Sequence, residues 1–214
     1  MNIGSLFSRH AKYRPNHLAV VFEDQRLTWF EFNQQINRLA NAFIDLGIQK
    51  GDKVATILPN CLELLEVYWA VAKMGAVVVP SSTLLLEPAM KTLLNDSDTV
   101  LLITNSEFVD KIDSIKPELP AIAEDRYILT DYSGQKGYRN YTDLKAAASD
   151  QEPEGIAIND DDPFNIMYSS GTTGLPPITC DRSTGQVPMS RSRVKVRDIS
   201  ASRKGASGFS AAAA

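Results

Sequence analysis

Cysteine and histidine are scarce in this chain. Its 214 residues include two cysteines, Cys61 and Cys180, and two histidines, His10 and His17. Cysteines so few and so far apart provide neither a disulfide framework nor the paired spacing of a zinc site. We therefore predict no metal site built on these side chains. The low cysteine content favours a reducing, cytoplasmic location.

Long hydrophobic runs are also lacking. The best apolar window, residues 67–79, is interrupted by Lys73, and it is shorter than the roughly 20 residues that span a bilayer. The start of the chain has no basic stretch followed by an apolar one, so it has no recognisable signal peptide. We expect no transmembrane segment.

The two ends of the chain differ in charge. Residues 1–175 carry 15 Lys and Arg against 24 Asp and Glu, a net charge of −9. Residues 176–214 carry 7 against 2, a net charge of +5. Clustered basic residues bind phosphates in a salt-dependent way. This stretch has a single aromatic residue, Phe209, and no recognised fold, so we expect no nucleic-acid binding.

Apolar strands alternate with helical patterns along the acidic part. A hairpin over residues 19–28 leads into a helix that Thr28 and Glu31 open as a capping box and that Gly47 ends. Further strands are predicted at 54–58, 76–79, 99–104, 126–130 and 164–168, and helices at 62–74, from 87 onward, at 106–115 and from Thr142 to Ala148. The alternation predicts an α/β fold with a mostly parallel sheet flanked by helices.

The last predicted strand runs into a segment rich in glycine and hydroxyl side chains. Gly allows the backbone to approach a ligand closely, Ser and Thr add donors without bulk, and successive backbone N–H groups form an anion-binding concavity. Ligands of such sheets bind at the carboxyl ends of strands. The sequence therefore predicts a phosphate-binding segment formed by Ser169, Ser170, Gly171, Thr172, Thr173 and Gly174.

Residues 168–176 resemble the phosphate-loop signature of the adenylate-forming (AMP-binding) acid ligases, Tyr-(Thr/Ser)-Ser-Gly-Thr-Thr-Gly-x-Pro-Lys-Gly. The match is ungapped through Pro176, after which the motif's Lys is Pro177 and its Gly is Ile178. A Walker A loop fits less well, because no Gly-Lys-Ser/Thr follows. Upstream segments resemble the same family in the same order, at residues 27–32, 47–54, 58–63 and 73–80. Among its branches, the chain is most similar to bacterial acid–CoA ligases.

The resemblance implies a reaction. Enzymes of this family join a carboxylic acid to the α-phosphate of ATP with Mg²⁺, release pyrophosphate, and pass the acyl group to a thiol such as coenzyme A. The signature segment serves the β- and γ-phosphates, so Ser169, Ser170, Thr172 and Thr173 offer hydroxyl and N–H groups while Gly171 and Gly174 let the loop wrap. The resemblance assigns no catalytic residue and no metal ligand within this chain.

Several parts of the family pattern have no counterpart here, among them the signature Lys, the later magnesium and ribose motifs, and the C-terminal domain with its catalytic Lys. We predict a partial AMP-binding domain over residues 1–176 and a basic, disordered tail, foreign to the family, over residues 177–214. A shifted reading frame or a fused end explains the abrupt change. We expect the chain alone to be inactive and to self-associate through surface that the missing part covers.

Two other interpretations stay open. The chain could be a catalytically dead α/β module that binds a nucleotide or a protein partner. It could also be a remnant without a selected role. The sequence does not identify the acid, and it does not distinguish coenzyme A from a carrier protein as the acceptor.

Overall fold

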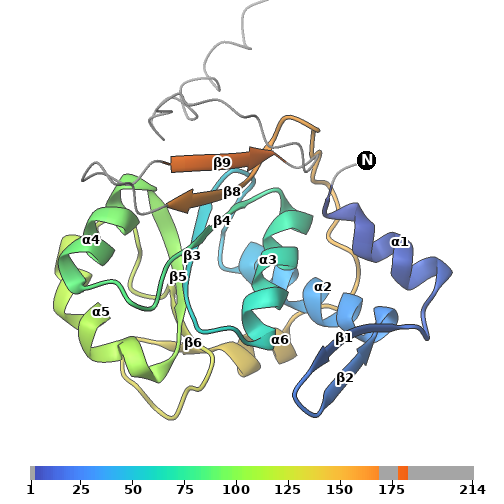
Figure 1. Cartoon of the computed structure of the whole chain (residues 1–214), viewed down its shortest axis with the longest axis horizontal. Helices are drawn as coiled ribbons and strands as arrows, with labels where there is room; N and C mark the ends of the chain where they lie inside the picture. Colours follow the sequence, from blue (N-terminus) through green and yellow to red (C-terminus); the bar gives the residue numbers. More distant parts are fainter. Residues whose placement is uncertain (1–2, 169–177, 183–214) are drawn as a thin grey trace, which may run out of the picture.

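A seven-stranded sheet forms the centre of the molecule, in the order β7-β6-β5-β3-β4-β8-β9 (Figure 1). The computed structural model describes residues 3–168 and 178–182. All neighbouring strands are parallel except β8 and β9, which pair antiparallel. The α/β class with a mostly parallel sheet is confirmed. The strands are β3 Lys53–Ile57, β4 Val77–Pro80, β5 Thr99–Thr104, β6 Tyr127–Leu129, β7 Arg139–Asn140, β8 Pro163–Tyr168 and β9 Ile178–Arg182.

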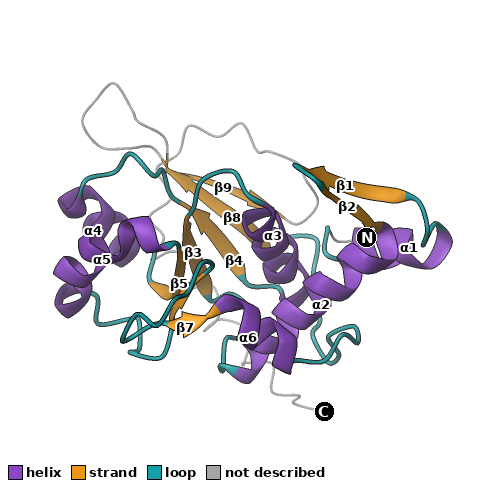
Figure 2. Cartoon of the chain, turned by 90° about the horizontal axis from the view of Figure 1, so that it is seen from below, coloured by secondary structure: helices purple, strands orange, loops and turns teal. Residues whose placement is uncertain are grey.

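Helices cover both faces of this sheet. Figure 1 shows α4 (Glu87–Asp96) and α5 (Val109–Ile115) on one face, and α2 (Trp29–Asp45), α3 (Leu62–Met74) and α6 (Tyr141–Ala147) on the other. Two short 3₁₀ turns, Ser106–Phe108 and Lys116–Glu118, flank α5. Helix α1 (Ser5–Tyr13) and the antiparallel hairpin of β1 (Leu18–Phe22) and β2 (Gln25–Thr28) lie at the outer end of the α2 layer (Figure 2).

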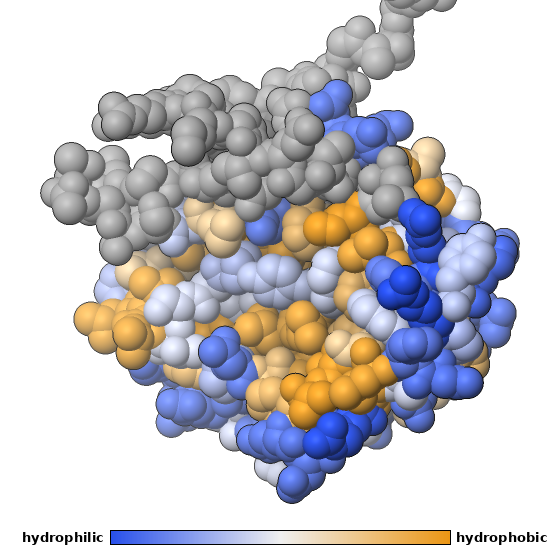
Figure 3. All heavy atoms as spheres, turned by 45° about the vertical axis from the view of Figure 1, so that its right-hand side comes forward, coloured by the Kyte–Doolittle hydropathy of each residue, from blue (hydrophilic) through white to orange (hydrophobic). Residues whose placement is uncertain are grey.

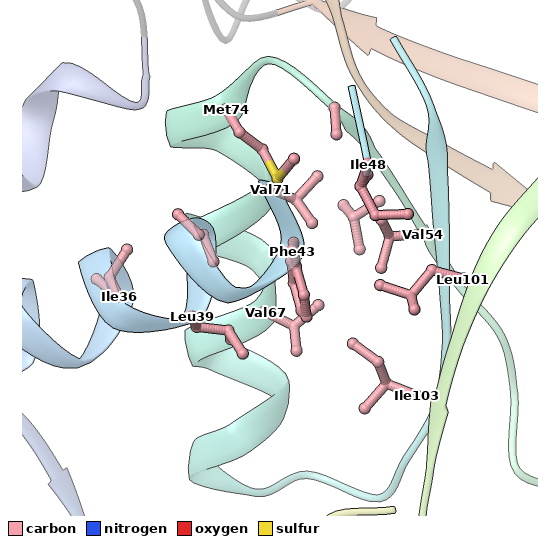
Figure 4. Close-up of a cluster of buried hydrophobic side chains, with 14 of the residues drawn as sticks. Ile36, Leu39, Phe43, Ile48, Val54, Val67, Val71, Met74, Leu101 and Ile103 are labelled. Carbon is pink, nitrogen blue, oxygen red and sulfur yellow. The ribbon is translucent and has the colours of Figure 1, made fainter. Parts of the chain in front are cut away.

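Each face of the sheet has its own apolar core. Alternate residues of a strand point to opposite faces, so Val54 and Val78 pack on the α2 side while Ala55 and Val79 pack on the α4 side. In Figure 4, Phe43 of α2 lies among side chains of α3 and of the central strands. Near-continuous apolar strands are typical of a parallel sheet buried on both faces. This burial explains why the strand predictions succeeded.

Capping residues determine where the best-predicted helices begin and end. Thr28 Oγ1 accepts a hydrogen bond from the Glu31 N–H at 3.2 Å, and Glu31 Oε2 accepts one from the Thr28 N–H at 2.9 Å. The predicted capping box is therefore confirmed. Gly75 ends α3 with φ +66°, a left-handed conformation that favours glycine.

Three local features differ from expectation. Helix α6 begins at Tyr141, and its cap is Asn140, whose side chain accepts from the Thr142 N–H at 2.9 Å. Thr142 is therefore not the cap, because Asn140 already satisfies that donor. Helix α1 and the two-residue strand β7 were not predicted, since short elements carry too little periodicity.

The tail also departs from the prediction of disorder. Residues Ile178–Arg182 form β9 and extend the sheet beside β8. Apolar periodicity is absent there, but an edge strand needs only backbone hydrogen bonds to one neighbour. Residues 183–214 lie outside the described part, and the domain boundary at residue 176 stays a prediction.

The segment from residue 148 to residue 162, here called the strap, connects α6 to β8 across the outer side of α2 (Figure 1). One face of α2 carries amides at intervals of four residues, which places them in a row along the helix. The Asn37 and Asn41 amides donate to the backbone oxygens of Asp150, Ser149 and Gln151 at 2.7–2.9 Å. Arg38 adds a bond to the Ala148 oxygen at 2.8 Å. The strap is thus held by a polar stripe of α2 that lies beside the apolar one.

A buried lysine joins the strap to three helices. The side chain of Lys73 is 3% exposed and lies 2.6 Å from Glu152 of the strap. Its ammonium also donates to Asn33, Asn37 and Ser8 at 2.7, 2.6 and 3.0 Å. Burial lowers the pKa of Lys73, and Glu152 acts against that shift. A buried charge without such partners is strongly unfavourable.

Glu152 is the partner whose charge depends on pH. Partial burial by itself raises the pKa of Glu152, but hydrogen bonds from Asn33 and Lys73 and the charge of Lys73 outweigh it. The net pKa is lowered. A carboxyl group with a lowered pKa stabilises the fold above its unfolded-state pKa and loses that contribution as pH falls through the folded-state value. The pairing is therefore complete at neutral pH and lost in acid.

The large apolar side chains that are more than half exposed occur in two regions. One lies around α1 and the hairpin, where Tyr13, Val21 and Phe30 are 71%, 51% and 51% exposed. Figure 3 faces this side and shows apolar residues interspersed with charged ones. The other lies between β4 and α4, where Leu84 and Leu86 are 89% and 67% exposed. Single exposed apolar residues are ordinary, whereas neighbouring ones mark contact surfaces.

Replacing Lys73 by Met tests the buried charge. We expect Lys73→Met to lower the free energy of unfolding by about 3 kcal/mol, because it leaves Glu152 without its charge partner and the two buried amide oxygens of Asn33 and Asn37 without their donor. Chemical denaturation monitored by circular dichroism measures the loss. The difference in unfolding free energy between the variant and the unaltered protein should narrow in acid, as Glu152, whose pKa is lowered in the fold, becomes protonated.

Lys91→Met is the matched control. Lys91 pairs with Glu118 at 2.7 Å on the surface, where the two side chains are 34% and 58% exposed. Such a pair contributes less than about 1 kcal/mol. Equal losses in the two variants would contradict the role given to Lys73.

Candidate functional site

Strand β8 delivers the predicted phosphate-binding segment to the carboxyl edge of the sheet. β8 lies beside β4 and parallel to it, with Val78 opposite Asn165. Its last residue, Tyr168, is the first residue of the signature. Because the strands are parallel, β3, β4, β5 and β6 end at the same edge. The predicted site residues themselves, Ser169, Ser170, Gly171, Thr172, Thr173 and Gly174, lie outside the described residues.

This edge contains a topological switch point. After β3 the chain turns to α3 on one face, whereas after the neighbouring β4 it turns to α4 on the other. Diverging connections open a crevice above the strand ends, which is where open α/β sheets bind ligands. β8 lies next to β4, so the signature segment begins beside this switch point.

Two side-chain oxygens at the edge have unused hydrogen-bonding capacity. Ser81 follows β4, and its N–H donates to the Thr56 oxygen of β3 at 2.9 Å. Asn105 follows β5. The Ser81 Oγ and the Asn105 Oδ1 are shielded from solvent and have no hydrogen-bond partner among the described residues. Leaving such atoms unpaired is costly, so both are candidates to meet a ligand or another part of the chain.

A second polar contact fixes neighbouring loops at the same edge. Asp131, which follows β6, accepts hydrogen bonds from the Ser106 N–H at 2.7 Å and from its hydroxyl at 2.6 Å. The loops after β5 and β6 are thereby tied together. These contacts fix the polar loops on the α4 side of the switch point.

Tyr168 ties the start of the signature to α4. Its hydroxyl donates to Asp96 Oδ2 at 2.9 Å, and its ring packs against the core on the α4 face. Burial and the neighbouring Asp96 raise the pKa of Tyr168, so the hydroxyl stays protonated and able to donate at physiological pH. The geometry sets the position from which the signature segment leaves the sheet.

The other reactive side chains of the described residues form no candidate site for a metal or for nucleophilic catalysis. No group of three or more His, Cys, Asp or Glu side chains that could hold a metal is found within residues 3–168 and 178–182. Cys61 is the N-cap of α3 and is half-buried. Burial raises the pKa of its thiol to about 11, so it is a weak nucleophile.

A groove of about 220 Å³ lies along α1, away from the carboxyl edge. It is lined by Leu6, Arg9, His10, Tyr13 and Arg14.

The comparison with protein families decides what this architecture is. The model of the AMP-binding enzyme family matches residues 7–177, most of the chain. The chain belongs to the AMP-binding enzyme family. The match ends at Pro177, where the sequence departs from the signature. The family resemblance expected from residues 168–176 is confirmed.

Curated relatives in this family are acid–CoA ligases. The chain is 36% identical over 177 residues to the long-chain-fatty-acid–CoA ligase FadD13 of Mycobacterium tuberculosis, covering 82% of this chain and 34% of the relative. It is 37% identical over 157 residues to a crotonobetaine/carnitine–CoA ligase of Escherichia coli, covering 71% of this chain and 29% of the relative. The chain thus spans about a third of the length of the curated relatives it matches.

Solved structures agree with the fold. The anthranilate CoA ligase AuaEII in complex with anthranoyl-AMP superposes with a TM-score of 0.79 at 26% identity, over 86% of this chain and 35% of that one. The N-terminal domain of FACL13 from Mycobacterium tuberculosis superposes with a TM-score of 0.73 at 30% identity, over 85% and 44%. The sheet therefore corresponds to part of the N-terminal domain of AMP-binding ligases.

Sequence reasoning missed most of the described edge. Ser81, Asn105 and Asp131 each lie one or two residues after the end of a predicted strand, and that position is the signal that could have identified them. The expectation of no membrane span agrees with the described helices, none of which is long and apolar enough to cross a bilayer.

Tyr168→Phe tests the tether between the signature strand and α4. Removing the hydroxyl deletes the bond to Asp96, so we expect a loss of about 1 kcal/mol in the free energy of unfolding. Tyr13→Phe is the matched control, because Tyr13 is 71% exposed and should lose almost nothing. Thermal unfolding followed by calorimetry compares the two. An unchanged melting temperature in Tyr168→Phe would contradict the tether.

Proposed function

We propose that this chain is the N-terminal part of an ATP-dependent carboxylic acid–CoA ligase. The observation that carries the proposal is the signature segment 168–176, which follows a strand that ends at the carboxyl edge, beside the switch point. The relatives named for fatty acids and for carnitine support an acid substrate. A fatty acid is our preferred class, since the fatty-acid ligase matches the larger share of this chain.

The residues of this chain would act on the nucleotide phosphates. Hydroxyl and N–H groups of Ser169, Ser170, Thr172 and Thr173 would donate to the β- and γ-phosphates, and Gly171 and Gly174 would allow close backbone approach. ATP bound with Mg²⁺ supplies an activated phosphate, and coenzyme A accepts the acyl group. The unpartnered Ser81 Oγ and Asn105 Oδ1 fit a polar ligand in the crevice.

We further propose that the chain alone does not catalyse acyl-adenylate formation. The cationic Lys of the signature is replaced by Pro177, so a charge that would face the departing phosphates is missing. The chain also spans about a third of its relatives. Orientation of both substrates, on which such chemistry depends, therefore lacks most of its groups.

ATP–pyrophosphate exchange tests this inactivity. We expect the purified chain to give no acid-dependent exchange above background across a panel of fatty and aromatic acids. The assay follows labelled pyrophosphate entering ATP. Exchange that requires an acid and disappears in Thr172→Ala would overturn the proposal, since a contaminating ligase would not respond to that change.

A dead nucleotide-binding module is the second candidate, and the loss of the signature Lys with retention of the hydroxyl residues favours it. Titration calorimetry with ATP distinguishes this module from a remnant without a role. The module should bind ATP, and Thr172→Ala should weaken that binding, whereas a remnant should bind no ATP. Reading the coding DNA beyond codon 176 in all three frames separates both from a ligase interrupted by a lesion. A frame that resumes with Lys-Gly supports the lesion.

We also predict self-association through the apolar loop between β4 and α4. Leu84 and Leu86 are its most exposed residues, so Leu84→Ser with Leu86→Ser should shift the chain toward monomer in sedimentation velocity. Leu86 is the N-cap of α4 without a side-chain cap, and Ser is favoured there. The fold should therefore not be weakened by the double change.

Leu18→Ser with Val21→Ser is the matched control on the hairpin, where both residues are 51% exposed. It removes the same kind of side chain from the other apolar region. A monomeric, cooperatively melting unaltered protein would contradict the prediction of self-association.

The cytoplasmic location expected from the sequence stays a prediction.

A further inference from the structure

One carboxylate of the strap is surrounded by four donors from the body of the fold. Oε1 of Glu152 accepts hydrogen bonds from the side-chain amides of Asn33 and Asn37, at 2.7 and 3.3 Å. Oε2 accepts one from the Ser8 hydroxyl at 2.8 Å and pairs with the Lys73 ammonium at 2.6 Å. Each oxygen thus has two donors, and the donors come from α1, α2 and α3. These four side chains are here called the cradle.

The cradle is built largely without the strap. Asn33, Asn37 and Lys73 are buried, and the amide oxygens of both asparagines accept from the Lys73 ammonium at 2.7 and 2.6 Å. The ammonium also donates to the Ser8 hydroxyl at 3.0 Å. The four groups therefore orient one another through contacts in which Glu152 takes no part.

The geometry of the cradle selects a carboxylate. A buried ammonium requires an anion beside it. Two donors on each of two oxygens match the acceptor capacity of an ionised carboxyl group, whereas a neutral amide offers a single acceptor oxygen. Bonds from several donors to one carboxylate also fix its orientation, which a halide ion does not have.

The piece of the strap that supplies Glu152 has few other means of attachment. None of residues 149–155 is buried. The apolar residues on either side of this piece, Ala148 and Ile156, are buried and packed against the core, respectively. Between them the contacts with α2 are hydrogen bonds and an ion pair. Segments with few buried apolar contacts open locally while the rest of a protein stays folded.

We propose that the cradle is a binding site for small carboxylate anions, and that Glu152 occupies it as an intramolecular ligand. The strap is then a lid over this site. When a free carboxylate takes the place of Glu152, residues 149–155 detach while the sheet and its helices stay folded. Tethering gives Glu152 a high effective concentration, so a free carboxylate competes with it only when abundant and binds more readily once Glu152 is removed.

Glu152→Ala empties the cradle and tests the site. At pH 7, replacing about 0.1 M chloride by acetate at constant ionic strength should raise the melting temperature of this variant by at least about 2 °C, because a ligand of the folded state stabilises it. The unaltered protein should not be stabilised, since its cradle is filled. Absence of stabilisation in Glu152→Ala would overturn the site.

Glu152→Gln is the matched control. Its amide keeps the cradle filled with a group of nearly the same shape, so acetate should leave its melting temperature unchanged. Adding Lys73→Met to Glu152→Ala removes the cation and should abolish the response to acetate. An equal response in all of these variants would be a general effect of the salt and would also overturn the site.

Limited proteolysis of the unaltered chain tests the lid and needs no variant. Thermolysin cleaves before apolar residues, and the bond before Ile156 lies at the end of the weakly attached piece. Replacing about 0.5 M chloride by acetate should speed this cleavage at least about threefold, because cleavage follows the population of the open form. Circular dichroism should stay native, and a peptide of residues 149–160 corrects for any effect of acetate on the protease. Unchanged cleavage would overturn the lid.

Discussion

The buried ammonium of Lys73 is the constraint on which the rest of the arrangement depends. A cation in an apolar interior must be surrounded by acceptors, and here they come from α1, α2 and the strap: Ser8, Asn33, Asn37 and Glu152. Satisfying one charge therefore positions three separate segments. The strap in turn brings the chain from β7, at one side of the sheet, to β8, at the other. The strand that carries the signature owes its place to this network.

The two faces of the sheet have different roles. The α2 face carries the buried lysine and a second buried charge, Glu66, which accepts from Tyr141 and pairs with Lys145. The α4 face leads to the polar edge, where Tyr168 contacts Asp96. The buried ion pairs on the α2 face hold the scaffold together. The contact between Tyr168 and Asp96 fixes the position from which the signature leaves the sheet. Rigid elements beneath a loop are what a binding site requires.

Much of the fold could be predicted because its signals are local. The capping box at Thr28, the stop at Gly75 and the apolar run of β5 each depend on neighbouring residues. The contacts of the strap with α2 could not be predicted, since they join residues more than 100 positions apart in the chain. Strand β9 was missed because edge pairing leaves no apolar pattern. For the site, the sequence identified the segment but not the edge beneath it, because only the strand order brings Ser81 and Asn105 to the same edge of the sheet.

The strand order also determines when each strand can pair while the chain is being synthesised. β3, β4 and β5 are close in the chain and can pair as soon as they leave the ribosome, whereas β8 must return to β4 after β5, β6 and β7 have been made. Until then the outer edge of β4 is open to other chains, and exposed strand edges invite aggregation. The nascent protein is therefore most vulnerable during the interval between translation of β4 and arrival of β8, and a slower ribosome would prolong that interval.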